Sequence, residues 1–95
     1  MTVREQIIAR LQREFAPETL EVTDDSERHR GHAGWREGGE SHFSVRIVSH
    51  RFRGLSRLQR HRLVHAALSP EPMGRIHALA LNLSDGLSAT ANGGS

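Results

Sequence analysis

Apolar side chains recur every three or four residues at the start of the chain, as they do on the buried face of an amphipathic helix. The positions concerned are Val3, Ile7, Ile8, Leu11 and Phe15. Thr2 and Glu5 have the spacing of a capping box, and Pro17 interrupts the pattern. We therefore expect a helix that begins after Thr2 and ends before Pro17.

The hydrophobic spacing then changes to the alternation that is typical of strands. Leu20 and Val22 alternate with polar neighbours, and every second residue of 43–47 is apolar. Between these segments, residues 26–40 are polar and rich in glycine and histidine, which indicates a loop. We expect the two strands to pair as a hairpin that carries this long loop.

A second helical pattern follows Gly54, where Ser56 and Gln59 repeat the capping spacing. The side of this helix that we expect to be buried carries Leu58, Leu63, Val64, Ala67 and Leu68. Proline is tolerated at the first position of a helix, so residues 69–71 allow a further short helical turn. Gly74 is expected to end that turn.

The last apolar segment, residues 76–83, alternates as a third strand in which His77 has the same parity as three leucines. Beyond Asp85 the residues are small and polar. The predicted order is α-β-β-α-α-β, an α+β fold with a three-stranded mixed sheet and helices packed on one face. We assign residues 1–84 to a single domain and residues 85–95 to a flexible C-terminal tail.

The composition narrows the class of protein. A chain of 95 residues with 36% hydrophobic and 25% charged residues predicts one folded domain with a thin core. No segment approaches the roughly 20 consecutive apolar residues that a membrane helix needs. Because no signal peptide is recognisable, we expect a cytoplasmic protein without membrane contact. The chain has no cysteine, so it can offer a metal only nitrogen or oxygen donors.

Three blocks of sequence point to a known family. They are LEVTDDSERHRGHAG, GGESHFSVRIVSHRFRGLSRLQRHRLVHAAL and RIHALAL, in this order. The middle block contains the run F-x-G-x-S-x-x-x-R-H-R, and the last contains I-H-A-L. On these blocks the chain resembles the BolA family from the first helix to Leu83.

The resemblance implies a fold similar to the class II KH domain and a partnership with a monothiol glutaredoxin. In such complexes a 2Fe-2S cluster is shared. The glutaredoxin contributes a cysteine together with glutathione, and the BolA-like chain contributes a late histidine and a His or Cys of the hairpin loop. His77 matches the late histidine, and His29 matches the loop ligand, with His32 as the close alternative. No cofactor is expected in the isolated chain.

Histidine chemistry agrees with this expectation. Neutral imidazole can replace thiolate on cluster iron, and a chain without cysteine has no thiolate to offer. From the residues alone, His77 could equally be a hydrogen-bonded structural histidine, and His29 and His32 could be solvated loop residues. The other histidines are expected to be structural or exposed: His42, His50, His61 and His65.

The net charge is only +2, but one stretch is strongly basic. It contains Arg51, Arg53, Arg57, Arg60 and Arg62. Arginines at a loop-to-helix junction can bind the phosphates of DNA or RNA, an acidic partner or the carboxylates of glutathione, or can form a solvated helix face. The small net charge and the sequence SPEPMG at residues 69–74, where a G-x-x-G loop would lie, argue against RNA binding of the KH type.

An enzymatic role has the least support. Ser41-His42 and Ser49-His50 are sequence neighbours, but adjacent strand residues point to opposite faces, so neither is expected to pair a nucleophile with a base. We therefore predict a binding protein that acts with a monothiol glutaredoxin in iron-sulfur cluster handling or iron regulation. A DNA-binding transcriptional regulator that uses the arginines is the alternative. The isolated chain is expected to be a monomer, with a homodimer left open.

Overall fold

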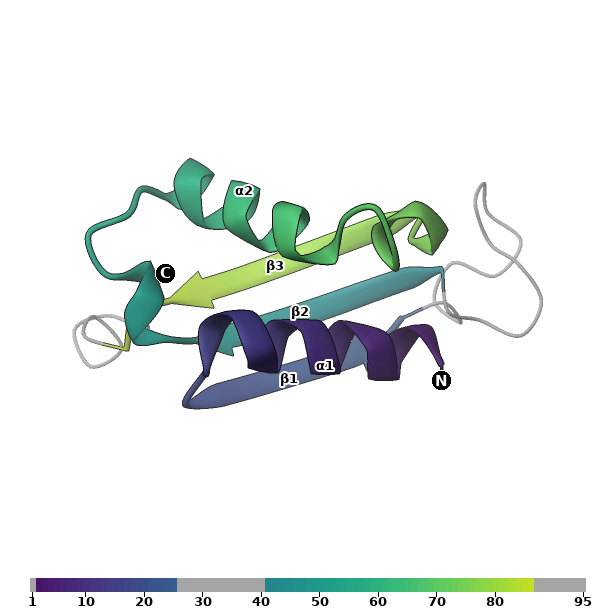
Figure 1. The fold of residues 1–95 in the computed structure, drawn as a ribbon, viewed down its shortest axis with the longest axis horizontal. Coiled ribbons are helices and arrows are strands. Elements are labelled where there is room, and N and C mark those ends of the chain that lie inside the picture. The colour runs from purple at the N-terminus through teal and green to yellow at the C-terminus, as the bar shows by residue number, and fades with distance from the viewer. Residues whose placement is uncertain (1, 26–40, 87–95) are drawn as a thin grey trace.

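The computed structural model describes residues 2–25 and 41–86 (Figure 1). The helices and strands are α1 (Val3–Phe15), β1 (Thr19–Asp24), β2 (His42–Val48), α2 (Arg57–Leu68) and β3 (Ala78–Ser84). Two short 3-10 helices, η2 (His50–Phe52) and η3 (Met73–Arg75), precede α2 and β3.

Both predicted capping boxes are present. Glu5 N donates to Thr2 Oγ1 at 3.0 Å, and Thr2 N donates back to Glu5 Oε1 at 2.8 Å. At the start of α2, Gln59 N donates to Ser56 Oγ at 3.1 Å, and Ser56 N donates to Gln59 Oε1 at 2.8 Å. Each box satisfies two amide groups that the first turn of a helix leaves without a partner, so both helices begin where the sequence predicted.

The three strands form one mixed sheet in the order β1-β2-β3. β1 is antiparallel to β2, with Thr19 opposite Val48, and β3 is parallel to β2, with His42 opposite Ala78. The predicted hairpin and the mixed sheet are therefore confirmed. Because β2 and β3 are parallel, both strands begin at the same end of the sheet and finish at the other (Figure 1).

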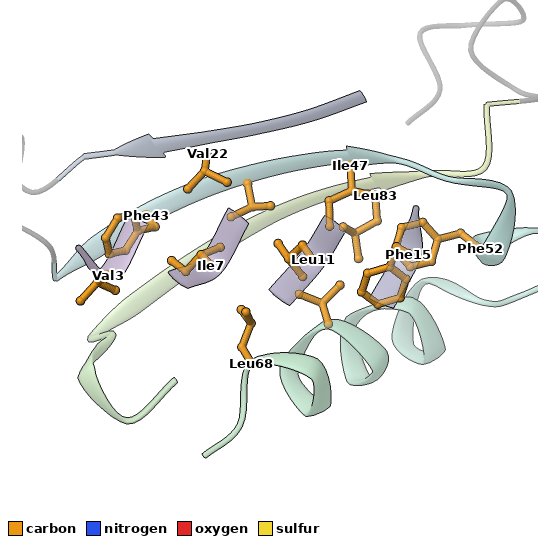
Figure 2. Packing of buried hydrophobic residues seen from close by; sticks show 12 residues of the cluster. Val3, Ile7, Leu11, Phe15, Val22, Phe43, Ile47, Phe52, Leu68 and Leu83 are labelled. Carbon is orange, nitrogen blue, oxygen red and sulfur yellow. The ribbon is translucent and has the colours of Figure 1, made fainter. Parts of the chain in front are cut away.

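Both helices cover the same face of the sheet, as predicted, and the core lies between the two layers (Figure 2). The core side chains are Val3, Ile7, Leu11, Phe15, Val22, Phe43, Val45, Ile47, Phe52, Val64, Leu68 and Leu83. The rings of Phe15 and Phe52 lie 5.0 Å apart between centroids, within the range that aromatic pairs favour. This contact joins the end of α1 to η2.

The buried side of α2 differs from the prediction. Val64 and Leu68 are fully buried, but the side chains of Leu58 and Leu63 are 58% and 42% exposed. Residues four apart lie on the same face of a helix, so the buried stripe through Val64 and Leu68 extends back to Arg60. Leu58 and Leu63 lie off that stripe, and the prediction was wrong for both.

The connection into β3 also differs in detail. The third helical element is the single 3-10 turn η3, which begins at Met73, and Gly74 lies inside this turn instead of ending it. Ile76 N donates to Met73 O at 3.0 Å and so still belongs to the turn. β3 therefore begins at Ala78, two residues later than predicted, and His77 precedes the strand.

Two predictions concern residues outside the described ranges. The loop 26–40, which carries His29 and His32, is one of them, and residues 87–95 of the predicted tail are the other. The start of the tail is described, and the carboxylate of Asp85 lies 3.8 Å from the guanidinium of Arg60. Within the described ranges, no helix combines the length and the apolar character that crossing a membrane would require.

Candidate functional site

The carbonyl group of Ser41 holds the backbone at the start of β3. His77 N donates to Ser41 O at 2.7 Å, and Ala78 N donates to the same oxygen at 3.2 Å. Ser41 lies at a bend immediately before β2, so this contact arises where the two parallel strands begin. The backbone of His77 is therefore fixed although its side chain is exposed.

The side chain of His42 lies next to that of His77. Their ring centroids are 5.1 Å apart and the ring planes are tilted by 52°. His42 is only 4% exposed, and its Nδ1 lies at hydrogen-bonding distance, 2.8 Å, from Ser41 Oγ. We call Ser41, His42 and His77 the histidine end of the sheet.

The contact between Ser41 and His42 corrects a prediction. Sequence reasoning excluded a pair because adjacent strand residues point to opposite faces, but Ser41 precedes the strand and its bend brings the hydroxyl to the ring. Ser41 is 1% exposed, so its hydroxyl is buried beside the ring of His42.

Asp25, which follows β1, and Ser44 of β2 continue the histidine end onto the face of the sheet that the helices leave uncovered. Asp25 N donates to His42 O at 2.7 Å, and the hydroxyl of Ser44 donates to the carboxylate of Asp25. These residues line a shallow hollow of about 350 Å³ with Ala78 and Ala80 of β3. The hydrogen bonds tie the end of β1 to the residue that contacts His77.

The metal-ligating side chains that the structure describes would fit a metal centre whose other ligands come from a partner molecule. The exposed imidazole of His77 offers a nitrogen ligand, and the chain has no thiolate. Among residues 2–25 and 41–86, no group of three or more His, Cys, Asp or Glu side chains is arranged to hold a metal ion. The described part of the chain therefore has no complete ligand set of its own, and His29 and His32 lie outside it.

The arginine run lies at the opposite end of the sheet, where β2 and β3 finish (Figure 1). Arg60 faces inward, with 18% of its side chain exposed. Its Nε donates to Leu55 O at 3.0 Å and its Nη1 donates to Leu83 O at 3.3 Å. Arg51 Nη1 donates to Glu14 O at 2.7 Å. These two arginines join segments of the fold through backbone carbonyl groups.

The other predicted contact residues of the run, Arg53, Arg57 and Arg62, are exposed. Arg53 Nη2 lies 3.3 Å from His50 Nδ1, and His50 Nε2 lies 2.9 Å from Glu18 Oε1. Arg57 lines a hollow of about 450 Å³ between the start of α2 and β3. We call the region of η2, the start of α2 and Asp85 the arginine end.

The remaining histidines have the structural or surface positions that the sequence predicted. His50 and His65 are exposed, and His61 is half-buried on α2, where it lines the same hollow as Arg57. Sequence reasoning did not predict that Ser41 and His42 contact His77. The signal was present in the parallel pairing of the second and third strands, because the first residues of such strands lie side by side.

A family model for BolA-like proteins matches residues 11–85. The chain belongs to the BolA-like family. Its relatives include "BolA-like protein 1" of Bos taurus, which is 52% identical over 79 residues, covering 83% of this chain and 56% of the relative. "DNA-binding transcriptional regulator BolA" of Escherichia coli (strain K12) is 45% identical over 82 residues, covering 86% of this chain and 74% of the relative.

Solved structures show the same fold as this BolA-like chain. The BolA domain of SufE1 from Arabidopsis thaliana superposes with a TM-score of 0.73 at 40% identity, covering 84% of this chain and 87% of that domain. BolA1 from the same plant gives a TM-score of 0.72 at 38% identity, with the same coverage. The chain spans little more than half the length of the mammalian relatives, 55% for mouse BolA-like protein 1.

Proposed function

We propose that this BolA-like chain pairs with a monothiol glutaredoxin and shares a 2Fe-2S cluster with it, in iron-sulfur cluster assembly, trafficking or iron regulation. One observation carries the proposal: His77 presents an exposed imidazole from a fixed backbone at the end of the sheet. In a family member without cysteine, imidazole is the ligand that can take the place of thiolate on cluster iron.

The roles of the chain's own residues follow from their positions. His77 would hold one iron through a ring nitrogen, and His29 or His32 of the loop would supply the second nitrogen. Ser41 keeps the backbone of His77 in place through its carbonyl group. Cysteine and glutathione on the glutaredoxin side would complete the ligand set. A cluster bound in this way would supply iron and sulfide for transfer, or a one-electron redox centre.

Reconstitution tests the proposal. The chain is mixed with a monothiol glutaredoxin, glutathione, ferric iron and sulfide, and the complex is isolated by size exclusion and examined by visible absorption and circular dichroism. We expect a spectrum that differs from that of the glutaredoxin homodimer and is lost with His77→Ala. His65→Ala, which removes another exposed imidazole, serves as the control. A spectrum that His77→Ala leaves unchanged would contradict the proposal.

The loop ligand is assigned by a second series. His29→Ala and His32→Ala are reconstituted separately and together under the same conditions. The variant that lacks the ligand should lose the mixed spectrum, and the other should keep it. If the double variant keeps the wild-type spectrum, neither histidine is a ligand, and the proposed nitrogen pair is wrong.

A DNA-binding role is the second candidate. It is favoured by the name of the E. coli relative, a DNA-binding transcriptional regulator, and by the exposed side chains of Arg53, Arg57 and Arg62 at and near the arginine end. Arginine guanidinium groups bind phosphate through paired hydrogen bonds, and such contacts make affinity depend on salt. The guanidinium of Arg60 already donates hydrogen bonds within the fold, so Arg57 and Arg62 are the better candidates for contacting phosphate.

Titration of a DNA duplex tests this second role. We expect affinity to fall steeply with salt, and Arg57→Ala or Arg62→Ala to weaken binding and reduce the salt slope by about one. Arg13→Ala, an exposed arginine of α1, is the matched control. Equal effects from all three variants would indicate a general charge effect and would contradict a site at the arginine end.

A further inference from the structure

Ser41 and His42 contact His77 in two independent ways. The carbonyl oxygen of Ser41 accepts hydrogen bonds from His77 N and Ala78 N, at 2.7 Å and 3.2 Å. The ring of His42 lies 5.1 Å from the ring of His77, between centroids, at a tilt of 52°. Tilted rings at this separation attract each other. The hydrogen bonds to Ser41 hold the backbone of His77, and the ring of His42 lies against the ring of His77.

The two supporting residues are themselves held firmly. Ser41 and His42 are 1% and 4% exposed. Ser41 Oγ and His42 Nδ1 lie 2.8 Å apart, and Asp25 N donates to His42 O at 2.7 Å. A change of rotamer at His42 would break a buried hydrogen bond, which is costly because no water replaces it. The ring of His42 is therefore a rigid surface beside His77.

We propose that Ser41 and His42 form a support that holds the exposed imidazole of His77 in one orientation for a metal held by a partner. The inference deepens the proposed function and rests on it for the identity of the metal centre. His42 is a positioning residue and not a ligand, because it is buried and its Nδ1 is engaged at Ser41 Oγ.

The physical reason for such a support is the entropy of an exposed side chain. A solvated histidine at the edge of a fold samples several rotamers, and binding a metal must select one of them. A neighbouring ring that already restricts the side chain lowers this cost before the partner arrives. Groups that orient a metal ligand without touching the metal typically change affinity by about 10- to 100-fold.

The first test needs no metal. In the isolated chain, three-bond NMR couplings across the Cα–Cβ bond of His77 report whether its side chain occupies one rotamer. We expect one dominant rotamer in the wild type, averaging in His42→Ala, and restored order in His42→Phe, which keeps a ring at this position. His65→Ala, on exposed α2 surface, should match the wild type. Unchanged rotamer populations in folded His42→Ala would overturn the proposal.

The second test uses the mixed complex with the glutaredoxin. We expect His42→Ala to shorten the lifetime of the 2Fe-2S cluster by about tenfold or more and to change its visible circular dichroism. His42→Phe should lie close to the wild type, since it keeps the ring contact. If His42→Ala fails to fold, His42→Leu carries the test, because it keeps a buried side chain at this position but removes the ring beside His77. A wild-type lifetime in folded His42→Leu would then overturn the proposal.

The two proposals fail in different ways. If the wild-type chain orders His77 through His42 but forms no mixed complex, the glutaredoxin function is wrong and the support remains. If His77→Ala abolishes the complex while folded His42→Ala changes neither the rotamer of His77 nor the lifetime of the cluster, the support is wrong and the function remains.

Discussion

The histidine end and the arginine end lie at opposite ends of the same sheet, and they use polar side chains differently (Figure 1). At the histidine end, Ser41 and His42 are buried and the side chain of His77 is exposed beside them. At the arginine end, Arg51 and Arg60 donate to backbone carbonyl groups of other segments. The first arrangement leaves an imidazole exposed beside buried polar groups, and the second joins segments of the fold to one another.

This difference shows that a run of one residue type in the sequence does not by itself indicate a functional site. The arginines lie close together in sequence, but Arg60 is on the inward face of α2 and its side chain is largely buried. The histidines are scattered in sequence, but parallel pairing of β2 and β3 brings His42 and His77 together. Substitutions at the two ends should therefore change stability by different amounts.

The largest effect is expected from the aromatic packing that underlies the arginine end. Phe52 is fully buried and its ring packs on Phe15, so Phe52→Ala should lower the free energy of unfolding by about 3–5 kcal/mol. Leu58→Ala, at a side chain that is 58% exposed, should change it by less than about 0.5 kcal/mol. Urea unfolding followed by circular dichroism measures both. Similar losses would contradict the assigned core.

The next largest effect on stability should distinguish Arg60 from Arg62. Arg60→Ala removes hydrogen bonds to Leu55 O and Leu83 O and should destabilise the fold by about 2 kcal/mol, the usual value for a charged donor. Arg62→Ala, at an exposed position of the same helix, should cost less than about 0.5 kcal/mol. Equal losses of stability in the two variants would mean that Arg60 has no special structural role.

A smaller difference in stability should distinguish Ser41, a supporting residue, from His77, the proposed ligand, at the histidine end. Ser41→Ala removes a buried hydroxyl that lies 2.8 Å from His42 Nδ1 and should cost about 1 kcal/mol. His77→Ala truncates an exposed side chain and should leave stability within about 0.5 kcal/mol of the wild type. Thermal unfolding of the two variants provides the measurement. A larger loss for His77→Ala than for Ser41→Ala would reverse the assigned roles.

The smallest expected effect is on the pH dependence of stability. Hydrogen bonds from the backbone and side chain of Thr2 lower the pKa of Glu5 below its ordinary value. Its contribution to stability is therefore present above the unfolded-state pKa and is lost as pH falls through the lowered folded-state pKa. Glu5→Gln keeps an acceptor at this position but does not titrate. Thermal unfolding between pH 7 and pH 3 should show a slightly weaker pH dependence in the variant, and an identical dependence would contradict this reading.

Local pattern was sufficient for most of the fold. The capping spacings at Thr2 and Ser56 located the starts of both helices, and alternation located the strands. The pattern failed on α2, where Leu58 and Leu63 are apolar but exposed. Which stripe of a helix is buried depends on how Val64 and Leu68 pack against other elements, and the sequence of the helix alone does not contain that information.

The candidate site was predicted only in part. His77 was identified through a family resemblance; the structure shows it exposed at the sheet end, and its role as a ligand stays a prediction. The support from Ser41 and His42 was missed because it depends on the register between β2 and β3, a contact between residues far apart in sequence. His29 and His32 stay predictions, because they lie outside the described residues.

Pulsed electron paramagnetic resonance tests most directly whether His77 binds iron. The chain is labelled with ¹⁵N-histidine and combined with unlabelled glutaredoxin and glutathione, and the 2Fe-2S cluster of the complex is reduced. We predict a ¹⁵N hyperfine coupling to the cluster in the wild type and in His65→Ala, whereas His77→Ala, which should not form the mixed cluster, should give only the uncoupled signal of the glutaredoxin cluster. A reduced cluster in the mixed complex without ¹⁵N coupling, or with a coupling that His77→Ala leaves intact, would contradict the account.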